Sequence, residues 1–306
     1  MHATCAPPSN IQGVFRRGLI KTWMDVVTFY TKSKLTYETD KLIAISAIAR
    51  ELNSTQQSKY LAGLWERDLV LELGWISEST SVPSFPFKDG KEIKVCDDSS
   101  GQEERPSETR YIAPSWSWAS LEGAVTYPYT DEIISSGNSY PLIHGAEPWV
   151  KPETGDAYGR VTDGKLSVLA QIMEVKLVAG GTARVVVHGN DILIPGSVFR
   201  DDFIDGIFRP ELEGVYLMPL VLCFFDTDHF LFIGVLLEPS TTIEPTMSQK
   251  VFKRIGALKW QATKATLERD PGLCFLLSLV GTIEWNSDCF SSFQCNMLER
   301  QRIMVI

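Results

Sequence analysis

The sequence predicts an α+β protein, with a short helical part at the N-terminus followed by a mostly antiparallel β barrel or sandwich. Apolar residues recur with helical spacing up to about residue 73, whereas from residue 111 onward they alternate or form short runs between turn residues. Short strands at such intervals are typical of antiparallel barrels and sandwiches. A chain of 306 residues is also long enough to bury a substantial core.

Three helices are expected in the first part of the chain. Residues 1–16 are predicted to be a disordered lead, and residues 17–76 a helical subdomain. The helices should begin near Arg17, just after Asp40 and near Lys59. Their apolar faces, in chain order, are Trp23, Val26, Val27 and Tyr30; Leu42, Ile45, Ile48, Ala49 and Leu52; and Leu61, Leu64, Trp65 and Leu69.

Asp40 and Lys41 stand where the second helix should begin. A carboxylate at this place can accept hydrogen bonds from free backbone N–H groups and interacts favourably with the helix dipole. We therefore expect Asp40 to cap the helix and Lys41 to be solvated, and we assign neither residue a catalytic role.

Residues 77–110 separate the helical part from the rest. They are rich in Ser, Pro, Gly, Lys, Asp and Glu and contain few apolar residues, which predicts a mobile surface loop or an insertion. The remaining residues, 111–306, are expected to form one β-rich domain.

Several strands are predicted in this domain. Residues 165–178 and 183–188 should form a hairpin around Gly180-Gly181, and residues 191–199 a further strand. A second hairpin should join residues 214–225 to 230–237, followed by a strand at 251–260. The apolar residues 273–280 fit either a strand or a short helix.

The segment from Tyr111 to Ser120 contains two tryptophans interleaved with serines behind a proline. Pro114 suits the start of a strand, after which Trp116 and Trp118 would share one face. Two interpretations follow: a buried core strand, or an aromatic platform for a base, a sugar or a peptide. An indole N–H needs a hydrogen-bond partner when buried, so the neighbouring serines fit both.

Composition excludes several classes of function. The formal net charge of −9 argues against nucleic acid and anionic membranes as partners. No apolar run approaches the ~20 residues of a membrane-spanning helix. Because residues 1–13 contain no long apolar run, no secretory signal is expected there. The cysteines, which form no C-x-x-C pair, are expected to be reduced thiols in a cytoplasmic protein. They are Cys5, Cys96, Cys223, Cys274, Cys289 and Cys295.

No catalytic or metal-binding site is predicted, and no cofactor. The chain lacks the G-x-S-x-G elbow of serine hydrolases, and Gly180-Gly181 lies between strands rather than before a helix. Two acidic groups could in principle serve glycoside chemistry or calcium binding, but both lie in turn-like contexts where Asp bonds to the local backbone. These groups are Asp201, Asp202 and Asp205, and Asp226 and Asp228 beside His229.

Several motifs in the same order resemble fungal heterokaryon incompatibility (HET) proteins, in the region that follows their HET domain. They lie at residues 23–30, 35–46, 60–65 and 113–120, with weaker matches at 234–237 and 252–256. The motif residues, which we expect to be structural, are Trp23, Asp40, Lys41, Gly63, Trp65, Ala113, Pro114, Ser115, Trp116, Ser117, Trp118, Ala119, Ser120 and Arg254.

The resemblance implies a role in self/non-self recognition, which in this family leads to programmed cell death. The HET domain itself, thought to trigger that death, has no counterpart here: its closing R-G-W…Q-E pattern is missing, and Arg17-Gly18-Leu19 is not a remnant of it. We therefore expect a non-catalytic interaction or regulatory module with a protein partner, its oligomeric state left open. The alternatives are a ligand-binding β-domain or enzyme with Trp116 and Trp118 as a pocket wall, and a truncated fragment without independent function.

Overall fold

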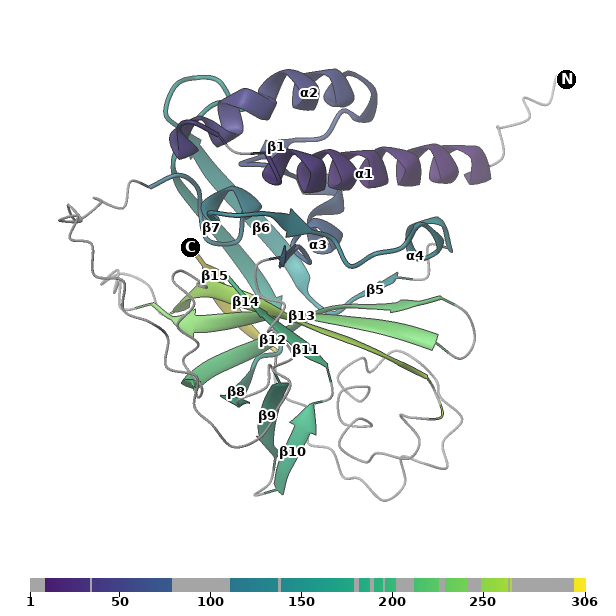
Figure 1. Cartoon of the computed structure of the whole chain (residues 1–306), viewed down its shortest axis with the longest axis vertical. Helices are drawn as coiled ribbons and strands as arrows, with labels where there is room; N and C mark the ends of the chain where they lie inside the picture. Colours follow the sequence, from purple (N-terminus) through teal and green to yellow (C-terminus); the bar gives the residue numbers. More distant parts are fainter. Residues whose placement is uncertain are drawn as a thin grey trace, which may run out of the picture.

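The computed structural model describes residues 9–33, 35–78, 111–136, 139–178, 182–187, 190–194, 196–201, 212–225, 229–240, 249–263, 265 and 300–306. Within these residues the chain has the expected α+β fold, with helices on one side of a nearly closed mixed barrel (Figure 1). Most of residues 77–110, the glycines 180 and 181, and the apolar run 273–280 lie outside the described residues.

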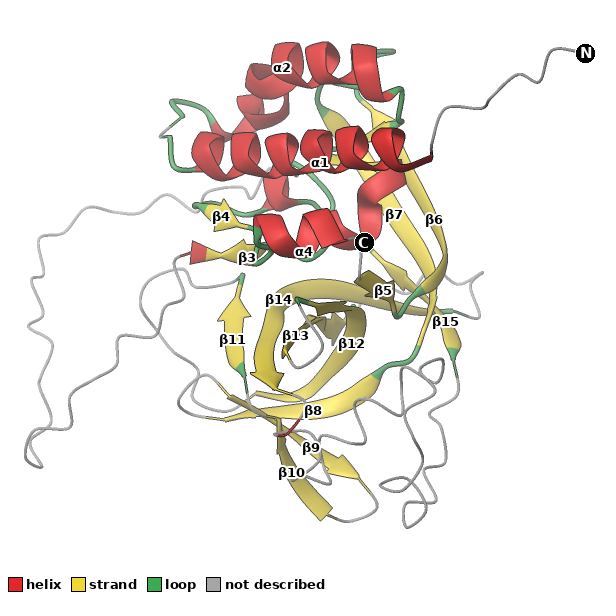
Figure 2. Cartoon of the chain, turned by 90° about the vertical axis from the view of Figure 1, so that its right-hand side faces the viewer, coloured by secondary structure: helices red, strands yellow, loops and turns green. Residues whose placement is uncertain are grey.

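The helical layer contains two long helices that lie side by side, and shorter ones beneath them (Figures 1 and 2). Its helices are α1 (Ser9–Thr31), α2 (Lys41–Gln56), α3 (Leu69–Glu72) and α4 (Asp131–Ser136), with single 3₁₀ turns at η1 (Glu38–Asp40), η2 (Glu66–Asp68) and η4 (Trp118–Ser120). Helix α1 begins eight residues before the expected start, directly after Pro7-Pro8, where Ser9 is a favourable first residue. Residues 9–16 are thus helical rather than part of a disordered lead.

Two short two-stranded sheets, β1–β2 and β3–β4, and one large sheet complete the fold (Figure 2). The large sheet has the order β10-β9-β8-β12-β13-β14-β15-β7-β6, with β5 beside β12 and β11 beside β14. Among the described strands the one parallel pair is β14–β15, so the expectation of a mostly antiparallel barrel is confirmed. The strands are β1 (Tyr60–Leu61), β2 (Leu64–Trp65), β3 (Ile76–Ser77), β4 (Val125–Thr126), β5 (Ser139–Pro141), β6 (His144–Pro152), β7 (Val161–Ala170), β8 (Met173–Val178), β9 (Thr182–Val187), β10 (Asn190–Ile194), β11 (Ser197–Arg200), β12 (Leu212–Phe224), β13 (His229–Pro239), β14 (Lys250–Thr263) and β15 (Gln301–Val305).

The third predicted helix, residues 59–73, is wrong. The chain instead forms the β1–β2 hairpin, the turn η2 and the single-turn helix α3. Ala62 and Gly63 have φ angles of 48° and 101°, which a right-handed helix cannot contain. The apolar spacing suggested a helix, but it arises because Leu61, Leu64 and Trp65 are all buried on the β1–β2 hairpin.

The predicted hairpins β8–β9 and β12–β13 are confirmed. Two expected strands are each divided: residues 165–178 into β7 and β8, and residues 191–199 into β10 and β11. Residues 171 and 172 belong to neither strand and separate β7 from β8. The two strands are not neighbours in the sheet: β8 pairs with β12, and β7 pairs with β15 and β6.

The helical layer and the barrel share one apolar core. Trp23 and Leu42 of the helices belong to the same buried cluster as Val168, Leu231 and Phe252 of the strands. A second cluster fills the part of the barrel remote from the helices, around Phe230, Phe232 and Trp260. The first core holds the two layers together, and the residues at their junction therefore define the candidate site.

Candidate functional site

The segment that follows Pro114 is a turn and a 3₁₀ helix, not the predicted strand. The Ser117 N–H donates to the Pro114 carbonyl at 2.9 Å, which closes the turn. The Ser117 hydroxyl then accepts from the Ala119 N–H at 3.0 Å and starts η4. Serine caps of this kind compete with strand pairing. The alternation of serine and tryptophan that predicted a strand is therefore found here in a turn and a 3₁₀ helix.

Trp116 and Trp118 are both buried, with 1% and 0% of their surface exposed. This confirms the interpretation of the segment as core and leaves no accessible face for an aromatic platform. The indole Nε1 of Trp118 donates to the Gly63 carbonyl at 2.7 Å, and Trp23 donates to the same oxygen at 3.1 Å. Helix α1, the β1–β2 hairpin and η4 therefore meet at one carbonyl group.

Gly63 is required at this point for two reasons. Its φ of 101° lies in a region that side chains disfavour. A Cβ atom would also stand 2.7 Å from Nε1 of Trp118, closer than real contacts allow. The Ser117 hydroxyl donates to the adjacent Ala62 carbonyl at 2.5 Å, and Trp65 packs edge-to-face on Trp23 with 5.5 Å between ring centroids.

The other half of the segment joins the barrel. Pro114 packs against Gly164 of β7, where a Cβ atom would come within 2.7 Å of the proline ring. The Ser115 hydroxyl donates to the Ile306 carbonyl and accepts from the Arg254 N–H at 3.0 Å. Ala113 and Ala119 are buried, and the Ser120 hydroxyl donates back to the Ser117 carbonyl at 2.8 Å.

Arg254 on β14 is 2% exposed and ties the barrel to the segment after α3. Its guanidinium donates to the carbonyls of Leu73 and Trp75 at 2.7 and 2.6 Å, and to Oδ2 of Asp201 at 2.8 Å. It also lies 3.3 Å from the centroid of the Trp75 ring. Burial lowers the pKa of Arg254, and the Asp201 carboxylate opposes that change. Arg254 therefore links β14 to the backbone of residues 73–75, which agrees with the structural role expected for it.

Lys41 is buried, contrary to the expectation that it is solvated. Its Nζ donates to the Leu121 carbonyl at 2.6 Å and pairs with Glu38 at 2.7 Å. Asp40 precedes α2 but its side chain does not cap the helix; it pairs instead with Arg160 at 2.5 Å. The distant partners Leu121 and Arg160 therefore replace the expected solvation of Lys41 and the expected helix cap by Asp40.

We call these motif residues and their partners the motif network. All of the predicted motif residues belong to it or pack beside it. Trp75 and Arg160 were not expected in it, and Asp201 was expected to bond to the local backbone of a turn, whereas it pairs with Arg254. In all three cases the partners are distant in the chain.

A buried polar cluster lies next to the motif network. Glu72 is fully buried, and its Oε2 accepts from the Trp65 N–H at 2.9 Å. Its Oε1 and the hydroxyls of Tyr60, Tyr127 and Tyr129 have no hydrogen-bond partner among the described residues. Burial raises the pKa of Glu72 well above its usual range, which favours the neutral form of this carboxyl in the folded protein. A single Glu within the apolar stretch 69–75 was the sequence signal that could have revealed it.

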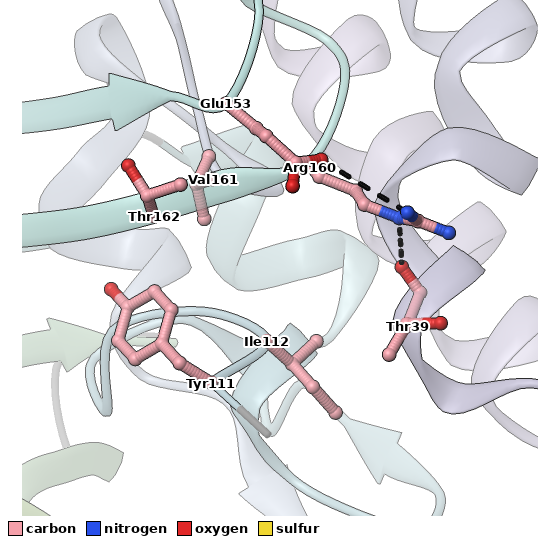
Figure 3. A pocket seen from close by; sticks show the side chains of 7 residues that line it. All are labelled: Thr39, Tyr111, Ile112, Glu153, Arg160, Val161 and Thr162. Carbon is pink, nitrogen blue, oxygen red and sulfur yellow. Dashed lines mark hydrogen bonds and ion pairs between the residues drawn. The ribbon is translucent and has the colours of Figure 1, made fainter.

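A surface pocket of about 230 Å³ opens at the junction of the layers (Figure 3). We call it the seam pocket. It is lined by Thr39, Tyr111, Ile112, Glu153, Arg160, Val161 and Thr162. Arg160 reaches toward Thr39 and donates through Nε to its carbonyl at 3.2 Å, whereas the Tyr111 ring lies on the side of Thr162 (Figure 3).

The remaining candidates give no site. Among the described residues, no group of three or more His, Cys, Asp or Glu side chains could hold a metal ion. Asp202, Asp205, Asp226 and Asp228 lie outside the described residues, while His229 begins β13. Cys223 is buried, and burial raises its thiol pKa to about 11.

No helix in the described part of the chain combines the length and apolar character needed to cross a membrane. In comparisons with known proteins, no family model, no curated protein and no solved structure matches this chain.

Proposed function

We propose that the chain is a non-catalytic interaction or regulatory module, similar to the region that follows the HET domain in fungal self/non-self recognition proteins. The observation that carries this proposal is the position of the motif residues. They are distant in sequence, yet they converge on one network that joins helices to barrel. Trp23, Gly63 and Trp118 meet at a single carbonyl, and Ser115 contacts both β14 and Ile306.

A network of this kind fixes how the two layers sit on one another and leaves recognition to the surface. The helical layer exposes several large apolar side chains, including Phe29 (79% exposed), Ile43 (44%) and Ile48 (47%). Apolar groups that gather in a contiguous exposed patch mark protein contacts, and the variants below test whether Phe29 and Ile48 take part in one. The net charge of −9 disfavours nucleic acid as the partner, and the cysteine pattern favours the reducing cytoplasm as the location.

The test compares retention of proteins from a fungal extract by the wild-type chain, by Phe29→Ser/Ile48→Gln, and by Trp149→Ser as control. Trp149 is 49% exposed and lies on β6, not on a helix. We expect a protein that the wild type and the control retain, that the double variant loses, and that binds the purified chain directly in calorimetry. Turnover of a substrate by the purified chain, lost on replacing an Asp or His, would contradict the proposal.

A further inference from the structure

The seam pocket has the size of a side-chain site rather than a cofactor site. Its volume of about 230 Å³ is below the ~300 Å³ at which pockets for whole small molecules begin. Its walls come from three separate parts of the chain: Thr39 before α2, Tyr111-Ile112 before the motif turn, and residues from the ends of β6 and β7. An occupant would therefore touch both layers at once.

The charges at the pocket leave one carboxylate in excess. Arg160 pairs with Asp40 at 2.5 Å and donates to the Thr39 carbonyl, so its positive charge is already engaged. Arg160 also forms a looser ion pair with Glu153, at 4.0 Å from Nη1, so one cation faces two carboxylates; the Glu153 side chain is 45% exposed. Nearby Asp163 lies opposite Lys151 in the β6–β7 register. Glu153 is therefore the group that can accept from a ligand.

The apolar part of the pocket suits the stem of a cation. Tyr111 is 46% exposed, and the Val161 side chain lies buried at the base of β7. Burial and the Asp163 carboxylate both raise the pKa of the Tyr111 phenol, so the ring stays neutral. Neutral aromatic rings attract ammonium and guanidinium groups, and long basic side chains pack their methylene stems on apolar surfaces.

We propose that the seam pocket binds one basic side chain, a lysine or an arginine, of a protein partner. The cation pairs with Glu153, and its stem lies along Tyr111, Ile112 and Val161. This inference rests on the proposed function, since it names the chemistry of the partner. The acidic net charge of the whole chain would increase the rate of encounter with such a partner.

The experiment titrates the isotopically labelled full chain with Nα-acetyl-lysine methylamide, Nα-acetyl-arginine methylamide and the glutamate analogue, followed by two-dimensional NMR. We expect one or both basic probes to shift the amide signals of Tyr111, Ile112 and Thr162, with a Kd of about 1–10 mM, typical of one exposed ion pair with an apolar stem. The glutamate probe should leave these signals unchanged.

Four variants identify the contacts. Glu153→Gln keeps the shape of the side chain and should weaken binding about two- to fivefold, whereas Glu51→Gln, on the exposed face of α2, should not. Tyr111→Leu should weaken binding, and Tyr111→Phe should preserve it, because the ring rather than the hydroxyl holds the cation.

Three results would overturn the inference: equal binding of the glutamate probe, unchanged affinity in Glu153→Gln, or no shift at the highest probe concentration. Putrescine is titrated in the same way as a fourth probe. If it binds more tightly than either capped residue, the ligand is a free diamine and the inference is also overturned. These outcomes leave the partner test on Phe29 and Ile48 unaffected, so failure of the pocket and failure of the proposed function can be distinguished.

Discussion

Replacing Trp118 by alanine should be among the most costly single changes in this chain. The side chain is fully buried, and an indole buries about 150–250 Å². At about 25 cal/mol per Å², this corresponds to about 4–6 kcal/mol, close to the ~3–5 kcal/mol found for buried aromatic truncations. The edge-to-face pair with Tyr30, at 6.0 Å between centroids, adds to the loss. The Gly63 carbonyl keeps its bond from Trp23, so it is not left unpaired. We expect a loss of about 4 kcal/mol.

The measurement is urea unfolding followed by far-UV circular dichroism, because fluorescence would change with the number of indoles. Trp149→Ala is the matched control: the same atoms are removed from a residue that is 49% exposed, and the cost should be about 1 kcal/mol or less. Trp118→Phe separates the hydrogen bond from the packing, with an expected cost of about 1–2 kcal/mol. If Trp118→Ala costs no more than the control, Trp118 is not part of the core, and the motif network fails as an explanation of the motif.

Three further changes test other parts of the junction. Gly63→Ala should destabilise by more than about 1 kcal/mol, because of its φ of 101° and the contact with Trp118, while Gly18→Ala inside α1 should stabilise by about 0.5–1 kcal/mol; thermal unfolding of both variants decides. Burial raises the pKa of Glu72, so the folded chain holds a proton that the unfolded chain releases as pH rises. Its contribution is therefore full below the unfolded pKa and falls as pH rises toward the folded pKa, by up to about 1.4 kcal/mol per pH unit. Glu72→Gln should flatten this fall in unfolding experiments between pH 5 and pH 8, and an unchanged slope would contradict a neutral Glu72. Lys41→Met should lose about 1–3 kcal/mol in urea unfolding, since the Leu121 carbonyl and Glu38 lose their partner; a cost near zero would mean that the buried ammonium is dispensable.

The hairpins could be predicted from local patterns, because the turn residues and the alternation of apolar and polar residues lie close together in the sequence. The β8–β9 and β12–β13 pairs follow directly from that alternation. Closure of the barrel did not follow, because β15 pairs with β14 and β7 across long stretches of sequence. No local signal records which strand lies beside another when the connection is long.

The errors at the candidate site have the same physical origin. A lysine at the start of a helix is usually solvated, yet Nζ of Lys41 donates to the carbonyl of Leu121, 80 positions further along the chain. The segment after Pro114 alternates like a strand, but hydrogen bonds through Ser117 fold it into a turn and η4. In both places a polar group found a specific partner, and such partners override periodicity. Burial of Trp116 and Trp118 was the favoured interpretation because Trp is highly buried on average, although Trp149 shows that residue type alone does not decide it.

The position of the motif network explains how structural residues would govern the binding that we propose at the seam pocket. Lys41 is anchored at Leu121, which holds Thr39 and Asp40 in place on one wall of the seam pocket. Pro114 packs on Gly164, which holds Tyr111 and Thr162 on the opposite wall. Arg160 then joins the walls through its bonds to Thr39 and Asp40. The pocket therefore requires the helices and the barrel to be docked correctly. Binding at this site would be lost whenever that docking is disturbed.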